Sequence, residues 1–202
     1  MTASQPQLIE STNPRPGDVR EREWLARIRA GDERAFEELY RAYKNHLAAF
    51  INSYVHSREV TEDLMQDLFL RIWQQRDIWE CPGPLGAYLF RAARNRAINY
   101  IRHQQVDVAF RESTSREDLA VASSLTPAAS DASLGAHDLA RAIDRAIEQL
   151  PPRCREVFVL NRRHYLSYAE VAAVMQLSVK TVEVQMGRAL ASLRSQLSEW
   201  LA

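Results

Sequence analysis

The sequence lacks a cysteine framework, an excess of charge and any long apolar run. Its two cysteines, Cys81 and Cys154, lie far apart in a chain of 202 residues, so neither a disulfide framework nor a metal-ligand cluster is expected. The formal net charge is zero, which excludes a polycation that binds nucleic acid over its whole surface. No apolar run approaches the length of a membrane span, and residues 1–20 are polar, unlike a signal peptide. These absences predict a cytoplasmic protein with free thiols and no direct membrane insertion.

Signatures of catalysis are also missing from the sequence. The five histidines are scattered, and there is no paired nucleophile and base, no glycine-rich phosphate loop and no metal-ligand spacing. His46, His56 and His164 are therefore expected to be packing or surface residues. We expect no enzyme, no catalytic residue, and neither a cofactor nor a metal.

Helical periodicity is what the sequence does contain, in two blocks. Apolar residues recur at spacings of three and four in residues 21–105 and again in 138–202, without any long β-type alternation. Between these blocks, residues 106–137 are rich in Ser, Ala, Thr and Asp and poor in large apolar side chains, which is typical of a flexible linker. Residues 1–20 have the composition of a disordered tail. The predicted fold class is all-α, with two small helical domains joined by a flexible linker.

Two neighbouring helices of the first block carry opposite charges. Residues 59–67, within a helix predicted from about Ser57 to Trp73, contain four acids and no base. Residues 81–106 contain four arginines and no acid, mostly on a helix predicted from Ala87 to about His103. An arginine-rich face suits contacts with phosphates and base edges, whereas an acidic face suits solvent or a basic protein partner. The alternative is two solvated helix surfaces, the commoner fate of charged residues.

The last forty residues predict a helix-turn-helix. Pro151 and Pro152 separate one helix from the next, and Ser167 with Glu170 forms a capping box that begins a short second helix. Ser178 is placed to cap a final helix. One stripe of that helix is expected to be buried, formed by Val179, Val182, Met186, Leu190, Leu193 and Leu197. Side chains off this stripe would face outwards, as in a DNA recognition helix, or in a helical hairpin with a merely solvated face.

Together these segments resemble the extracytoplasmic-function (ECF) subgroup of the sigma-70 family of RNA polymerase sigma factors. The segment EDLMQDLFLRIW at 62–73 is similar to the family's polymerase-binding helix, and YLFRAARNRAINYIR at 88–102 to the helix that recognises the −10 promoter element. The segments LPPR at 150–153, LSYAEVA at 166–172 and SVKTVE at 178–183 are similar to the domain that recognises the −35 element.

The resemblance implies that residues 21–105 are sigma region 2 and residues 138–202 are sigma region 4. It implies an alternative sigma factor that binds core RNA polymerase and directs promoter recognition, −10 melting and transcription initiation. The implied partners are core polymerase, through its β′ clamp helices and β subunit, promoter DNA, and an anti-sigma factor. A polymerase-independent regulator of the LuxR type is the alternative, but it has no reason to carry the acidic and arginine-rich helix pair.

Matching positions imply three sets of site residues. The core-polymerase set is Asp63, Leu64, Gln66, Asp67, Phe69 and Trp73. The −10 set is Tyr88, Arg91, Arg94, Asn95, Asn99 and Arg102, with the loop 79–86 as the wall of a pocket for a flipped base. The −35 set is Ser178, Lys180, Thr181, Glu183, Gln185 and Arg188, with phosphate contacts from Arg162, Arg163 and His164 nearby.

Overall fold

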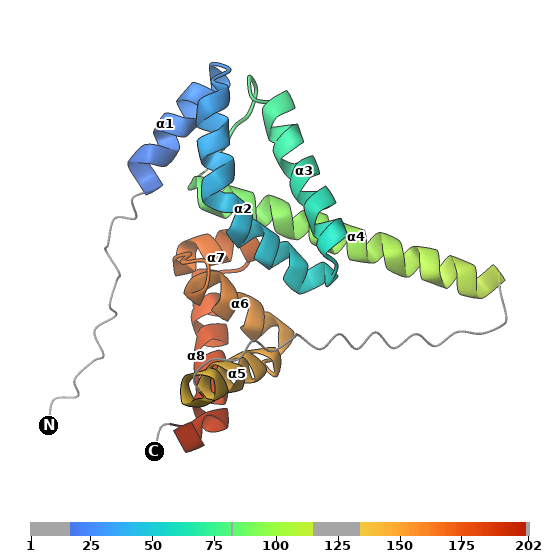
Figure 1. The fold of residues 1–202 in the computed structure, drawn as a ribbon, viewed down its shortest axis with the longest axis vertical. Coiled ribbons are helices and arrows are strands. Elements are labelled where there is room, and N and C mark those ends of the chain that lie inside the picture. The colour runs from blue at the N-terminus through green and yellow to red at the C-terminus, as the bar shows by residue number, and fades with distance from the viewer. Residues whose placement is uncertain (1–16, 82, 115–133, 201–202) are drawn as a thin grey trace, which may run out of the picture.

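The N-terminal part of the chain folds into four helices. The computed structural model describes residues 17–81, 83–114 and 134–200 (Figure 1). The first four helices are α1 (Gly17–Arg29), α2 (Glu33–Val55), α3 (Arg58–Gln74) and α4 (Leu85–Thr114). They occupy the segments that the periodicity predicts, and α4 crosses beneath α2 and α3 and extends outwards beyond them (Figure 1).

Local side-chain chemistry sets the junctions between the first three helices. Asp32 begins α2, because its carboxylate accepts hydrogen bonds from the backbone N–H groups of Arg34 and Ala35. Ser57 begins α3 by accepting from the N–H of Val60. Between them, His56 ends α2 with a left-handed φ of 52°. The sharp connection makes α2 and α3 neighbours, and they pack together.

The C-terminal part contains α5 (Leu134–Glu148), α6 (Pro152–Arg162), α7 (Tyr168–Met175), α8 (Val179–Gln196) and the 3₁₀ turn η1 (Ser198–Trp200). None of the described helices is both long enough and apolar enough to cross a membrane.

The predicted helix-turn-helix is confirmed by α7 and α8. Ser167 and Glu170 form the expected capping box, in which the Ser167 N–H donates to the Glu170 carboxylate at 2.7 Å. Gln176 ends α7 with a left-handed φ of 57°, and the Ser178 hydroxyl accepts from the N–H of Thr181 at 3.1 Å to begin α8. These caps place two helices in tight succession, as the motif requires.

Part of the expected stripe on α8 is wrong. Val182, Met186, Ala189 and Leu193 are buried, whereas Val179 and Leu190 remain exposed. The predicted and the observed stripes have the same helical spacing of three and four residues, so periodicity alone does not decide between Ala189 and Leu190. Packing buries the small side chain of Ala189, whereas the sequence predicted that the neighbouring Leu190 would be buried.

Helix ends also differ from the sequence expectation. α1 begins at Gly17, inside the predicted tail, because no proline follows Pro16 until residue 82. α4 continues past His103 to Thr114, inside the predicted linker, because residues 104–114 contain no glycine or proline to end it. The remaining parts of those two predictions, residues 1–16 and 115–133, lie outside the described residues.

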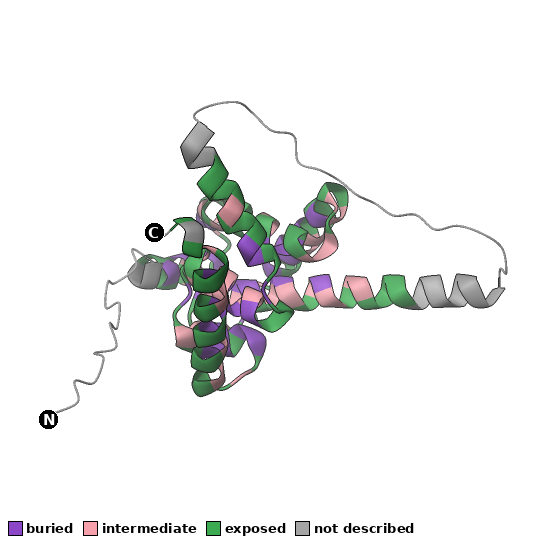
Figure 2. Cartoon of the chain, turned by 90° about the horizontal axis from the view of Figure 1, so that it is seen from below, coloured by how far each residue is buried: buried purple, intermediate pink, exposed green. Residues whose placement is uncertain are grey.

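The two helical domains pack against each other, which the linker prediction did not anticipate. A single buried cluster contains Phe50 and Phe90 from the first domain together with Val171 and Val182 from the second. The main junction is formed by α4 and α7. Burial is greatest in the first turns of α4, and residues 102–105 are exposed (Figure 2). Because α4 packs against α2 as well as α7, it contributes to both domains.

Candidate functional site

The acidic face of α3 is exposed but partly neutralised. Asp63 and Gln66 are on the surface, and among the described residues Asp63 forms no ion pair. Asp67 lies 3.2 Å from the guanidinium of Arg71 and 3.2 Å from that of Arg96 on α4. The face therefore offers Asp63 to a basic partner, while Asp67 also links α3 to the arginine-rich helix.

Phe69 occupies the core instead of the binding surface expected for it. Its side chain is 4% exposed and packs edge-on against Phe36 and Tyr40, with ring centroids 6.0 and 4.9 Å away. Leu64 and Trp73 are only half-buried. The Arg76 guanidinium lies over the Trp73 ring, 4.7 Å from the ring centroid. Phe69 thus supports the α3 surface from beneath, because burial removes it from direct contact with a partner.

Most of the −10 set forms one exposed stripe along α4. Arg91, Asn95, Asn99 and Arg102 all lie on the surface, at spacings of four, four and three that keep them on one face. The opposite face of the same turns is buried through Phe90, Ala93 and Ala97. The stripe combines cationic donors with amide groups, which suits contact with a phosphate backbone and base edges.

Arg94 differs from the other members of the −10 set. Its side chain is 22% exposed, and its guanidinium binds the carboxylate of Glu156 on α6, itself 13% exposed. Nη2 of Arg94 lies 3.4 Å from Oε2 of Glu156, and Nε donates to Oε1. The Tyr54 hydroxyl donates to the same carboxylate. In this arrangement Arg94 is not available to DNA, because the C-terminal domain holds it.

Burial and the Glu156 charge also act on the neighbouring phenol. Burial is the larger cause and the negative charge of Glu156 the second, and together they raise the pKa of Tyr54 well above its usual value. Tyr54 is therefore a stable neutral donor to Glu156. The sequence did not indicate Tyr54 and Glu156, because they lie 102 residues apart and neither belongs to a motif.

His164, at the same junction between the domains, also has a different environment from the one that the motif predicts. Its ring lies against Phe90, Phe50 and His46, with centroids 4.8, 5.7 and 5.7 Å away. Burial, with smaller contributions from His46 and Arg163, lowers the pKa of His164 to about 4. A neutral ring enclosed by aromatic side chains fits the packing role expected from the scattered histidines and not the phosphate contact expected from the motif.

The −35 set is divided between exposed and occupied side chains. Lys180, Glu183 and Arg188 are exposed on α8. The hydroxyls of Ser178 and Thr181 hydrogen-bond to each other at 2.7 Å, and Ser178 also caps α8 through the Thr181 N–H. Gln185 is half-buried and accepts a hydrogen bond from the Cys154 thiol at 3.0 Å.

The cysteines are both free thiols, as expected. Cys154 is buried beneath α8. Burial raises the pKa of Cys81 to about 11, with the nearby Glu21 charge adding to this effect. A thiol with so high a pKa is protonated at neutral pH and is a weak nucleophile.

Comparison with known proteins places both domains in one family. Residues 39–106 match the family model for sigma-70 region 2, and residues 140–193 match that for sigma-70 region 4. The RNA polymerase sigma factor CarQ of Myxococcus xanthus is 31% identical over 175 residues, which span 87% of this chain and 96% of that protein.

Two solved structures resemble the fold. CnrH, in complex with the cytosolic domain of CnrY, superimposes with a TM-score of 0.61 at 28% identity, covering 89% of this chain and 98% of that one. The sigma factor RpoE of Bartonella quintana, in complex with the anti-sigma factor NepR, has a TM-score of 0.59 at 25% identity, covering 81% and 96%. Because both family models match in one chain and the relative CarQ spans most of its length, the chain belongs to the ECF subgroup of the sigma-70 family of RNA polymerase sigma factors.

Proposed function

We propose that the exposed surfaces of α3, α4 and α8 divide the work of promoter-directed transcription initiation. The α3 face around Asp63 and Gln66 binds the β′ clamp helices of core polymerase, and the β subunit supports the C-terminal domain. The α4 stripe and Tyr88 capture the melted −10 strand, and α8 enters the major groove at the −35 element. The single observation that carries this proposal is the uninterrupted stripe of Arg91, Asn95, Asn99 and Arg102 next to an acidic helix.

This assignment needs no catalytic residue and no cofactor of the chain's own, since polymerase performs the chemistry. The site of action is the cytoplasm. The LuxR-type alternative accounts for α7 and α8, but it gives no purpose to the charge segregation between α3 and α4.

An anti-sigma factor is the third proposed partner, after core polymerase and promoter DNA. CnrH and RpoE are each seen with a bound protein, which for RpoE is named as an anti-sigma factor. In this chain such a partner would cover the exposed carboxylates of α3 and the exposed arginines of α4, because both surfaces must be free for polymerase and DNA.

The docked domains impose a condition on promoter binding. Arg94 contacts Glu156 in the described arrangement, so it reaches DNA only after that ion pair breaks. We therefore expect the two domains to separate when the chain binds polymerase and promoter.

Run-off transcription tests the proposal directly. Core polymerase is incubated with a supercoiled promoter library, with and without the protein, and start sites are mapped. Defined starts that need the protein, and that weaken with Asp63→Ala while the exposed control Glu59→Ala retains them, are the expected result. Duplex binding that is unaffected by polymerase, without any defined start, would instead support the LuxR-type regulator.

A further inference from the structure

The first helix contacts the middle of the connection that leads from α3 into α4, and also the first residue of α4. Arg29, in the last turn of α1, donates from Nε and Nη2 to the carbonyl oxygen of Trp79 at 3.0 and 2.7 Å. Glu21, two turns earlier on α1, accepts from the backbone N–H of Leu85 at 3.2 Å. One helix thus contacts a carbonyl in the middle of the connection and the amide where α4 begins.

The contact of Glu21 is buried and closely packed. Its side chain belongs to a residue that is 8% exposed, and a carboxylate so placed requires hydrogen-bond donors. The donors are the Leu85 amide, one of the unsatisfied N–H groups at the start of α4, and the Tyr43 hydroxyl. The positive end of the α4 dipole adds to this stabilisation. A Cβ at Gly86 would lie 3.2 Å from the Tyr43 hydroxyl, so only glycine leaves that hydroxyl its full space.

The held atoms adjoin the −10 set. Tyr88 lies one turn beyond Leu85, and its ring packs on Trp79 with centroids 5.6 Å apart. Arg91 and Asn95 continue from Tyr88 along successive turns of α4. The direction in which Tyr88 and this stripe face promoter DNA therefore depends on how the first turn of α4 is fixed.

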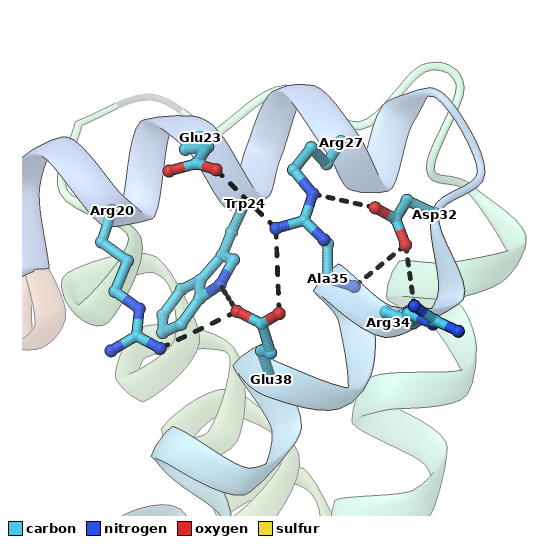
Figure 3. A network of polar contacts seen from close by, with 8 residues as sticks. All are labelled: Arg20, Glu23, Trp24, Arg27, Asp32, Arg34, Ala35 and Glu38. Carbon is cyan, nitrogen blue, oxygen red and sulfur yellow. Dashed lines mark hydrogen bonds and ion pairs between the residues drawn. The ribbon is translucent and has the colours of Figure 1, made fainter.

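Other side chains already anchor α1 to α2. Figure 3 shows Trp24 donating from Nε1 to Glu38 at 2.9 Å, and Arg27 paired with Asp32 at 2.8 Å. Arg20 lies beside the same Glu38 at 3.8 Å and over the Trp24 ring at 4.9 Å. Because this network holds α1 in place, Arg29 and Glu21 are not required merely to keep α1 on the domain.

We propose that α1 is a positioning element for −10 recognition, in which Arg29 and Glu21 orient the first turn of α4 and, through it, Tyr88. The inference rests on the proposed function of α4 and assigns to α1 a role in promoter selectivity. Arg29 and Glu21 do not touch DNA themselves. They act through Trp79, Leu85 and Tyr88.

The test compares promoter selectivity between variants of α1. Arg29→Ala and Glu21→Gln are the perturbations, Arg29→Lys restores the charge and part of the donor capacity, and Arg22→Ala is the matched control at an exposed position of the same helix. Run-off transcription is measured on promoters with single-base changes in the −10 or −35 element, and core-polymerase affinity and melting temperature are measured beside it.

The expected result is a loss of discrimination among −10 variants of about tenfold for Arg29→Ala, the scale of one or two lost hydrogen bonds. Discrimination at −35 and polymerase affinity should match Arg22→Ala, and Arg29→Lys should recover part of the loss. Hydrogen exchange should speed up at the first amides of α4 and not in α2.

Two outcomes would overturn the inference while the proposed function stands. One is unchanged −10 discrimination in both variants. The other is an equal loss of −10 discrimination, −35 discrimination and polymerase affinity, which would show general destabilisation. If the wild-type protein itself directs no defined start sites, the proposed function fails and takes this inference with it.

Discussion

Replacing Glu156 by alanine should release the C-terminal domain from the N-terminal one. Glu156 receives hydrogen bonds from Arg94 and from Tyr54, and both charged side chains of the pair are mostly buried. Hydrogen bonds to a charged group are worth about 1.5–3 kcal/mol net, and breaking a fully buried pair costs about 3–5 kcal/mol. Since Arg94 retains some access to water, which would solvate it after the change, we expect a loss of about 2 kcal/mol in the docking free energy.

A loss of about 2 kcal/mol corresponds to roughly a thirtyfold shift of the equilibrium towards separated domains. Small-angle X-ray scattering at matched concentration measures this as an increase in the radius of gyration. Glu148→Ala, at an exposed position of α5, is the control and should scatter like the wild type. The freed Arg94 should also strengthen binding of a single-stranded −10 oligonucleotide.

The ion-pair argument has a clear refutation. If Glu156→Ala scatters like the wild type, the apolar contacts between α4 and α7 hold the domains without Glu156. A double-mutant cycle with Arg94→Ala measures the coupling itself, and an interaction energy near zero would contradict the reasoning even if the domains separate.

Three further changes test other parts of the structure. Burial, with smaller contributions from His46 and Arg163, holds the pKa of His164 near 4 in the docked chain. Below about pH 6.5, His164 therefore binds a proton in the separated chain but stays neutral in the docked chain. Docking should thus weaken as the pH falls from 7 to 5, show little dependence above 7, and lose this dependence in His164→Gln, all measurable by scattering. Gly187→Ala should raise stability by about 1 kcal/mol in thermal unfolding, because a Cβ there meets nothing within 4 Å and glycine disfavours a helix interior; an unchanged or lower melting temperature would contradict this. Asp63→Ala should weaken core-polymerase binding without altering helix content, and equal affinity in a titration would remove Asp63 from the interface.

Local chemistry made much of the helical architecture predictable. The capping box of Ser167 and Glu170 and the cap at Ser178 involve residues three apart, so their spacing in the sequence is enough to indicate them. The exposed stripe on α4 follows from helical periodicity in the same way. The spacing does not determine which residues form the buried stripe on α8. Ala189 and Leu190 are adjacent, and only packing decides which of them is buried.

The division between sequence and tertiary structure lies in the range of the interactions. Helix type, order, caps and charge segregation depend on neighbours within a few residues, and the sequence by itself determined them, together with the family through its motifs. The packing of the two domains, the ion pair between Arg94 and Glu156 and the contacts of α1 with the start of α4 join residues at least 50 positions apart. Such contacts depend on where whole helices come to lie, since side chains meet only after the core has formed, and the tertiary structure alone decided them.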